Sequence, residues 1–436
     1  MEIVNIKDSK KAGFMKILLI AIPLVTVLII SQPIPSFSYG LLSHEAIIDA
    51  TWEKSIQPLL KSKFPNSTKE ELKSAHAYVY GGSVIADIGY YPFGSALFSH
   101  LVHYVRSGDF VYALLVEAHD INEYAFALGA LCHFEADQYG HPLGTNKTVA
   151  NMFPRLKNRY GKEVTFEQGR DQHVKVEFGF DVLQTARGNY ESNAYHDFIG
   201  FQISDSVLDR ALIKTYGIGL KDLFTSLPIA VANFRFSVKI FIPELTRDAW
   251  KIKNSFIMKL NPLATEKTYR YRFDKKNYRK EFATLKVQST VLEIILGGLP
   301  KYGPLSRFKP TVPDSVSEIL FEQSFETILA NYSGTLKKLK SGELAYDNVD
   351  LDTGEKTSMG EYELADKTYY HLLMKLRRDK SANINDALKK NLIAYYSNRD
   401  SSSKYRSNTH KGKKITKALI KLNIAYVAQQ PARRFL

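Results

Sequence analysis

The stretch that decides the fold is residues 122–137, which read NEYAFALGALCHFEAD. Its apolar residues recur at intervals of three and four, which is typical of a helix. Because Ala125 to Leu131 is apolar on all sides, we expect this helix to be buried. His133 and Asp137 follow one helical turn apart and therefore share a face. A buried imidazole and carboxylate need partners, and a divalent cation can supply one.

Helical periodicity extends along most of the chain. Ser204–Tyr216 shows the same spacing, strand-like alternation is scarce, and no repeat of fixed period is present. We therefore expect an all-α protein. Pro243 and the polar stretch 265–280 predict a boundary. A second helical block is expected over about 281–398, interrupted by a turn-rich loop at 347–360.

Composition narrows the function classes. With 44% hydrophobic and 24% charged residues, the chain is not collagen-like, of low complexity or wholly disordered. The single cysteine, Cys132, excludes an intrachain disulfide and any zinc or iron–sulfur site built from cysteines, and we expect it to pack in the core. The net charge of +14 favours anionic partners such as phosphate esters, nucleic acid or anionic lipid surfaces.

The first 38 residues predict a targeting segment. Lys10, Lys11 and Lys16 precede an apolar run from Ile17 to Ile30, and Ser36-Phe37-Ser38 offers small residues for cleavage. The run is shorter than the about 20 residues that a spanning helix needs. We expect a signal peptide and export to the periplasm or the medium. A retained N-terminal anchor, which would leave the protein on the membrane, is the alternative.

Histidines are concentrated in one part of the sequence. Eight of the 11 lie between His44 and His173. His141 follows Asp137 by four residues, and its neighbours Gly140 and Pro142 predict that the helix stops there, so that His141 approaches from a turn.

Other nitrogen and oxygen donors lie in the same region. His173 and Glu177 repeat the one-turn spacing, and Asp87 is an isolated acid in an apolar loop. His100 and His103 follow it at helix-neighbour spacing. Nitrogen and oxygen donors without a thiol suit zinc.

Taken in order, these residues resemble the zinc-dependent phospholipase C family. The series reads Tyr39-Gly40-x-x-x-His44, Asp87, a histidine at 100 or 103, His133-x-x-x-Asp137, His141 and His173-x-x-x-Glu177. Relatives of this family include the single-strand-specific nucleases, which share a trinuclear zinc site and an all-helical fold. The stretches 350–354 and 360–366 are also similar to parts of larger bacterial members.

The resemblance implies an all-α, multi-helical zinc-dependent phospholipase C/nuclease-like domain with a C-terminal helical extension. The expected parts are a signal peptide or anchor (1–38), a catalytic domain (39–245), a helical C-terminal region (246–398) and a basic, solvated tail (399–436).

The resemblance also implies up to three Zn²⁺ ions. The first would be held by Asp87, by His103 or His100, and by His133 and Asp137, with His103 favoured of the two alternatives. The second would use the freed amine and carbonyl of Tyr39, together with His44 and a bridging Asp137. The third would use His141, His173 and Glu177. In this interpretation, signal cleavage before Tyr39 is part of building the site.

The implied reaction is phosphodiester hydrolysis by a zinc-bound hydroxide. Phospholipase C-like cleavage of a phospholipid to diacylglycerol and a phosphorylated headgroup is the first expectation, with Asp87 and Asp137 as the catalytic residues. A single-strand-type nuclease with the same zinc site is an alternative, and only then is nucleic acid a partner. A non-catalytic, metal-stabilised module that binds anionic surfaces is the other. Peripheral contact with an anionic membrane surface is also expected.

Overall fold

The computed structural model describes residues 40–187, 201–260, 262–263, 265–266, 311, 313–343, 345–379, 382–398 and 402–422. The expected signal peptide and Tyr39 lie outside the described residues. So do most of the polar stretch at 265–280, the start of the second helical block and the end of the tail.

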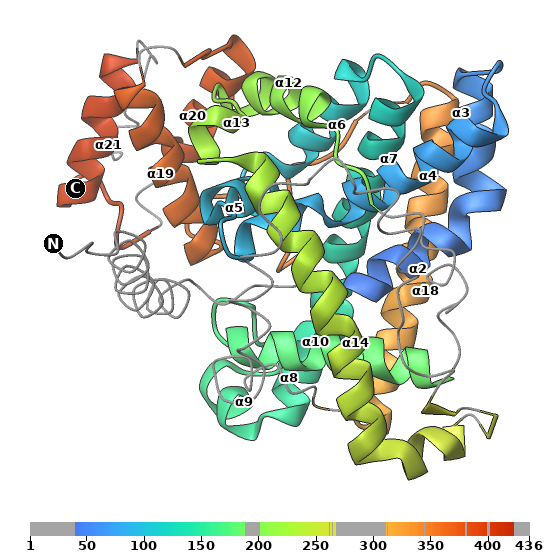
Figure 1. The fold of residues 1–436 in the computed structure, drawn as a ribbon. Coiled ribbons are helices and arrows are strands. Elements are labelled where there is room, and N and C mark those ends of the chain that lie inside the picture. Colours follow the sequence, from blue (N-terminus) through green and yellow to red (C-terminus); the bar gives the residue numbers. More distant parts are fainter. Residues whose placement is uncertain are drawn as a thin grey trace, which may run out of the picture.

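The predicted all-α fold is confirmed. Across the described residues the regular structure is helical, apart from one isolated antiparallel bridge between Val349 and Lys356. The first helices are α2 (Leu41–Thr51), η1 (Trp52–Ile56), α3 (Gln57–Lys63), α4 (Lys69–Val84), η2 (Ile85–Tyr90), α5 (Ala96–Tyr104), α6 (Ser107–Glu117), α7 (Ile121–Gly140), η3 (His141–Thr145), α8 (Asn146–Met152), α9 (Pro154–Tyr160) and α10 (Arg170–Arg187). The others are α12 (Asp205–Tyr216), α13 (Leu220–Leu223), α14 (Leu227–Leu260), α18 (Ser315–Lys340), α19 (Glu363–Arg378), α20 (Asp386–Ser397) and α21 (His410–Lys421) (Figure 1).

Helix α7 is the centre of the packing and lies unusually close to α4. A Cβ atom on Gly129 of α7 would lie 1.9 Å from the carbonyl oxygen of Val79, and one on Gly82 of α4 would lie 2.0 Å from that of Phe126. Only glycine permits such close backbone contact. The contact brings the end of α4 next to His133 of α7, whose ring donates to the Ser83 carbonyl.

The end of α7 corrects one expectation. The helix ends at Gly140, but the chain does not leave the helical path there. It widens into the π-helical turn η3 and continues into α8. A proline inside an α-helix lacks the backbone N–H for the i−4 bond and crowds that carbonyl, and a π turn accommodates both. His141 therefore lies on this widened turn and not in a loop.

The C-terminal helices share the core of the N-terminal ones. Helix α18 lies along α7, where the Tyr332 hydroxyl donates to the Leu128 carbonyl and Thr335 donates to Glu135 (Figure 1). Buried side chains of α18 to α21 belong to the same hydrophobic cluster as those of α2 to α12.

Two further expectations are corrected here. Helix α14 runs for 34 residues through Pro243, so the chain does not break at this proline. A proline removes one backbone hydrogen bond, but the turns on either side keep theirs. The basic tail is not merely solvated, because Ile415, Ala418 and Leu419 of α21 are buried. None of the helices described here combines the length and the apolar character needed to cross a lipid bilayer.

Candidate metal centre

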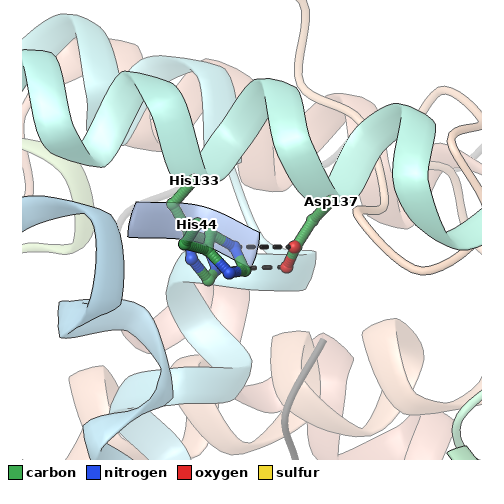
Figure 2. A group of neighbouring side chains, drawn as sticks. All are labelled: His44, His133 and Asp137. Atoms are coloured by element: carbon green, nitrogen blue, oxygen red, sulfur yellow. Dashed lines mark ion pairs between the residues drawn. The ribbon is translucent and has the colours of Figure 1, made fainter. Parts of the chain in front are cut away.

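Asp137, near the end of α7, lies at the middle of the site. Its Oδ2 atom is 3.1 Å from Nε2 of His133, one turn earlier on the same helix. Its Oδ1 is 3.3 Å from Nε2 of His44 in α2, and Oδ2 is 3.4 Å from Nε2 of His103 in α5. All four side chains are buried. One carboxylate therefore faces imidazoles from three helices. Figure 2 shows Asp137 with two of these imidazoles, those of His44 and His133.

Asp87 extends this group from the 3₁₀ turn η2, where the sequence had indicated an apolar loop. Its Oδ1 lies 3.5 Å from Nε2 of His103, and the Nε2 atoms of His103 and His133 are 3.1 Å apart. Two sets of ligand atoms result, each within 4.8 Å: His44, His133 and Asp137, and Asp87, His103 and His133. His133 belongs to both sets, so the two positions are adjacent.

The backbone determines how these imidazoles are protonated. Nδ1 of His44 lies 3.2 Å from the Gly40 carbonyl oxygen. Nδ1 of His103 lies 2.7 Å from the Ser99 carbonyl oxygen, and Nδ1 of His133 lies 2.9 Å from that of Ser83. A carbonyl oxygen only accepts, so each Nδ1 carries a proton and donates. A neutral ring then directs the lone pair of Nε2 at Asp137.

This arrangement requires positive charge and fits a metal ion. Two unprotonated Nε2 atoms 3.1 Å apart cannot hydrogen bond to each other. Asp87 Oδ1 and both oxygens of Asp137 are buried, and no hydrogen bond reaches them within the described residues. Burial opposes ionisation, yet His133, His103 and His44 hold the pKa of Asp137 well below its usual range. The nitrogen and oxygen donors, with no thiol, suit Zn²⁺.

The pKa of His103 also shows that the surroundings of this ring favour a positive charge. Burial lowers this pKa, but Tyr90, Asp137 and Asp87 together raise it well above its ordinary value. A proton on this ring would therefore supply the same positive charge as a bound cation. Metal and proton compete for one lone pair, as they do for metal-binding histidines in general.

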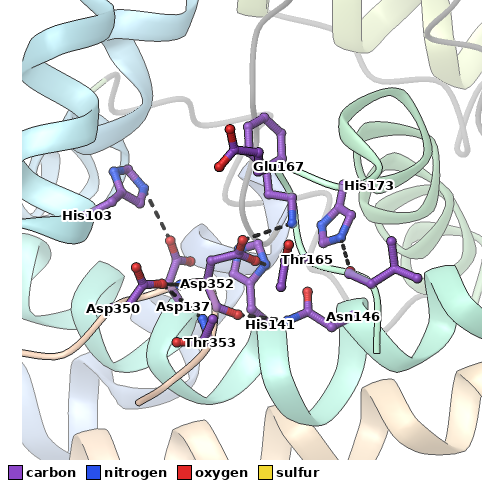
Figure 3. Close-up of polar contacts among 12 residues, drawn as sticks. His103, Asp137, His141, Asn146, Thr165, Glu167, His173, Asp350, Asp352 and Thr353 are labelled. Carbon is purple, nitrogen blue, oxygen red and sulfur yellow. Dashed lines mark hydrogen bonds and ion pairs between the residues drawn. The ribbon is translucent and has the colours of Figure 1, made fainter. Parts of the chain in front are cut away.

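A second group of donors lies beyond the end of α7. Nδ1 of His141 is 3.2 Å from Oδ1 of Asp352, and the His141 and His173 rings stack with centroids 5.7 Å apart. Nε2 of His173 donates to the Val164 carbonyl at 2.6 Å, which leaves Nδ1 as its lone-pair atom. His141, His173 and Asp352 form a third set within 4.8 Å (Figure 3).

Glu177 borders this third set from α10. Its Oε1 is 3.5 Å from Nδ1 of His173. Both of its carboxylate oxygens are buried, and neither has a hydrogen-bond partner in the described part of the chain. Burial and the neighbouring carboxylates Asp87, Asp137 and Asp352 raise the pKa of Glu177 well above its usual value. A cation would relieve this repulsion and keep the group ionised.

Comparison with known families matches residues 43–226 to the zinc dependent phospholipase C family. Over this segment the chain is similar to the zinc-dependent phospholipase C family. The resemblance seen in the sequence is confirmed, and the segment contains every expected ligand from His44 to Glu177. Searches of curated proteins and of solved structures found no significant match. The family match and the buried histidine and carboxylate groups support a metal-dependent, phospholipase-like function.

The two histidines that the sequence left open take different positions in this phospholipase C-like segment. His103 lies in the donor group, whereas His100 belongs to none of the three sets. The His100 ring lies between Tyr90 and Tyr104, with centroids 5.8 Å from each. Burial, assisted by His103 and Arg170, lowers the pKa of His100 to about 3, so the ring is neutral. Tyr39 lies outside the described residues, so the placement of its amine stays a prediction.

Asp352 is a site residue that the sequence analysis did not identify. It lies 211 residues after His141 and 179 residues after His173, outside the family match. The only signal was the likeness of 350–354 to larger bacterial members, which assigned no role to the acid. Aspartate is common in turns for structural reasons, so its position in the sequence did not mark it as a metal ligand.

Asp181 was also missed, and it supports the candidate metal centre from the side of α10. It follows His173 and Glu177 on α10 at successive four-residue intervals, so all three share a face. Its carboxylate accepts from the backbone N–H of Leu42 and Ser43, at 3.1 Å each, and from the Ser43 hydroxyl at 2.7 Å. These bonds hold the start of α2, and with it His44.

Proposed function

We propose that this protein is a zinc-dependent phosphodiesterase that cleaves phospholipids to diacylglycerol and a phosphorylated headgroup. The observation that carries the proposal is Asp137, a buried carboxylate facing three imidazoles inside the family-matched segment. Zinc, when bound, supplies Lewis acidity and lowers the pKa of a coordinated water toward about 7.

The residues supply charge balance around the phosphate. Asp87, Asp137 and Glu177 are the carboxylates of the expected ligand series, and the histidines are neutral ligands. With Asp352 of the third donor set, four carboxylates balance two zinc ions and leave the charge of three zinc ions incompletely neutralised, so a site holding three attracts an anionic diester. It also favours the extra negative charge that develops on phosphorus in the transition state.

Asp87 and Asp137 have different roles in the proposed reaction. Asp137 is enclosed by imidazoles and orients the site. Asp87 lies at the edge of the group, within 4.8 Å of the ligand atoms of His103 and His133, and keeps Oδ1 without a hydrogen bond in the described residues. Asp87 is therefore the group that would accept a proton from the attacking water.

Hydrolysis of phosphatidylcholine tests the proposal directly. We expect the zinc-loaded protein to release diacylglycerol and phosphocholine, to lose this activity in chelator, and to regain it when zinc is restored. Single-stranded DNA is assayed under the same conditions. Cleavage of DNA without cleavage of lipid would replace the proposal with the nuclease alternative. A zinc-loaded protein inactive on both substrates and on a panel of other diesters would favour the binding module.

Peripheral contact with an anionic membrane is part of the proposal. The outer face of α21 carries four exposed lysines beside the exposed Ile420: Lys413, Lys414, Lys417 and Lys421. Such a basic amphipathic helix is attracted to anionic lipid surfaces. We expect sedimentation with phosphatidylserine vesicles but not with pure phosphatidylcholine, and loss of sedimentation when the four lysines become glutamine. Equal binding of the lysine variant would remove α21 from the membrane contact.

Export and cleavage before Tyr39 complete the proposal. His44 lies in the first turn of α2, and the Gly40 carbonyl that accepts from its ring belongs to the residue just after Tyr39. A freed amine on Tyr39 would therefore start close to this histidine. N-terminal sequencing of the exported protein should begin at Tyr39, and an intact N-terminus would favour the anchor.

A further inference from the structure

We propose that Asp352 is a metal ligand in this protein and that the metal ion thereby links the C-terminal segment to the family-matched segment. The matched segment ends at residue 226, so on its own it lacks this carboxylate. The inference concerns how the third cation is held and does not depend on which substrate is hydrolysed. We call residues 347–362 the acidic loop.

The Asp352 side chain is oriented as a ligand that uses one oxygen. Oδ2 accepts from the Phe166 backbone N–H at 2.8 Å and from the Tyr362 hydroxyl at 2.5 Å. Oδ1 points the other way, 3.2 Å from Nδ1 of His141, and no hydrogen bond reaches it in the described residues. One oxygen is thus saturated by donors, and the other is left for a cation.

The two histidines present matching atoms. Nδ1 of His173 is a lone-pair atom because Nε2 donates to Val164. Nδ1 of His141 is buried and has no hydrogen bond among the described residues. A carboxylate oxygen with two imidazole nitrogens, all within 4.8 Å, is a common zinc ligand set, completed by Glu177 or water.

The acidic loop is attached to the matched segment around this point. The backbone N–H of Leu351 donates to the carbonyl of His103 at 3.1 Å, and the Asn146 side chain donates to the carbonyl of Asp352 at 2.7 Å. Ser107 donates to the carbonyl of Val349 at 2.6 Å. One hydrogen bond therefore goes directly to the backbone of a ligand of the other group. Figure 3 shows the acidic loop lying between His103 and the end of α7.

Metal binding and loop attachment are then linked equilibria. A cation that binds only when the acidic loop is in place stabilises the attached state, by an amount that increases with its concentration. Lys356, whose side chain is 81% exposed, provides a trypsin site within this loop. Cleavage after Lys356 therefore reports loop attachment without any measurement of activity.

The experiment compares Asp352→Asn with Glu355→Gln in the full chain. Asparagine keeps a carbonyl oxygen for Phe166 and Tyr362 but turns an amide toward His141. Glu355 is an exposed acid of the same loop, so its variant matches the change in charge. Bound zinc per chain is measured by mass spectrometry after dialysis against graded chelator, and tryptic cleavage is followed with and without zinc.

We expect wild type and Glu355→Gln to retain the same zinc content and to be protected from trypsin at Lys356 by zinc. Asp352→Asn should lose one zinc ion per chain, or release it at a chelator concentration that is lower by about tenfold or more. Its cleavage should not respond to zinc. Unchanged zinc release and unchanged protection in this variant would overturn the inference.

A second variant covers the case in which Asp352→Asn does not fold. Tyr362→Phe removes one donor from Oδ2 and leaves the carboxylate in place, so it should shift zinc release in the same direction by a smaller amount. No shift would count against the inference. A protein that loses zinc as expected but hydrolyses no lipid would contradict the proposed function alone.

Discussion

The Asp181 carboxylate in α10 holds the backbone N–H and the hydroxyl of Ser43, the residue next to His44. The contact is so close that a Cβ atom on Gly40 would lie 2.4 Å from the same carboxylate. Asp181 therefore acts as the cap of α2, although 138 residues separate it from Ser43. The position of the first ligand depends on a helix near the end of the family match.

Replacing Asp181 with alanine should lower the free energy of unfolding by about 1–3 kcal/mol, because buried N–H groups of α2 lose their acceptors. Denaturant titration of the zinc-free protein measures this change. Asp386→Ala, an acid 88% exposed at its side chain, serves as the control and should change stability by less than about 0.5 kcal/mol. Equal stability of the two variants would show that the cap contributes nothing.

The close packing of α4 and α7 predicts a large effect of a single methyl group. Gly129→Ala places a Cβ atom against the Val79 carbonyl, so the helices must separate and His133 must move away from Ser83. We expect destabilisation of about 1–3 kcal/mol or more, together with weaker zinc binding. Thermal unfolding and chelator titration measure the two effects.

Gly334→Ala in α18 is the matched control for this glycine. Nothing lies within 4 Å of the position that its Cβ would take, so helix propensity alone should stabilise the protein by roughly 0.5–1 kcal/mol. Two alanine substitutions in two helices should therefore change stability in opposite directions. If both had the same small effect, the packing at Gly129 would be looser than described.

Asp137→Asn should disrupt the metal centre, because this carboxylate faces three imidazoles. We expect loss of bound zinc and a decrease in lipid hydrolysis of about 10²-fold to 10³-fold or more. Glu135→Gln on the same helix removes the same charge but can still accept from Thr335, so it should retain metal and activity. Metal content and turnover, measured together, would contradict the assignment if Asp137→Asn kept both.

His100 predicts a particular pH dependence of stability. Burial, with His103 and Arg170, lowers its folded-state pKa to about 3, from 6.5. The unfolded chain binds the proton first as pH falls, so the stability that neutral His100 contributes is present above pH 6.5 and is lost between pH 6.5 and 3. Between pH 7.5 and pH 5, the free energy of unfolding of wild type should fall by about 1–2 kcal/mol more than that of His100→Gln.

Urea titrations in chelator at pH 7.5, 6 and 5 measure this difference. The comparison of wild type with His100→Gln cancels the titration of the histidines that do not interact with His100. Parallel stability curves over this range would mean that His100 has the same pKa in the folded protein as in the unfolded chain. The side chain would then be more accessible to water than its position between Tyr90 and Tyr104 indicates.

Local patterns in the sequence predicted the helical class and the neighbourhood of several donors. A helix places residues i and i+4 on one face whatever surrounds it, so the spacing of His133 and Asp137 already implied that they meet. The confirmed all-α fold and family resemblance rest on such short-range features. Local signals failed where packing could override them, as at Pro243 and in the tail that forms α21.

Contacts between distant segments had no such local signature. The approach of Asp352 to His141, the cap that Asp181 provides for α2, and the glycine contact of α4 with α7 each join parts of the chain far apart in sequence. They follow from how helices pack, and packing depends on the shapes of many side chains at once. The sequence alone therefore indicated most of the residues that could hold a cation, and the tertiary structure decided which of them lie together and added Asp352.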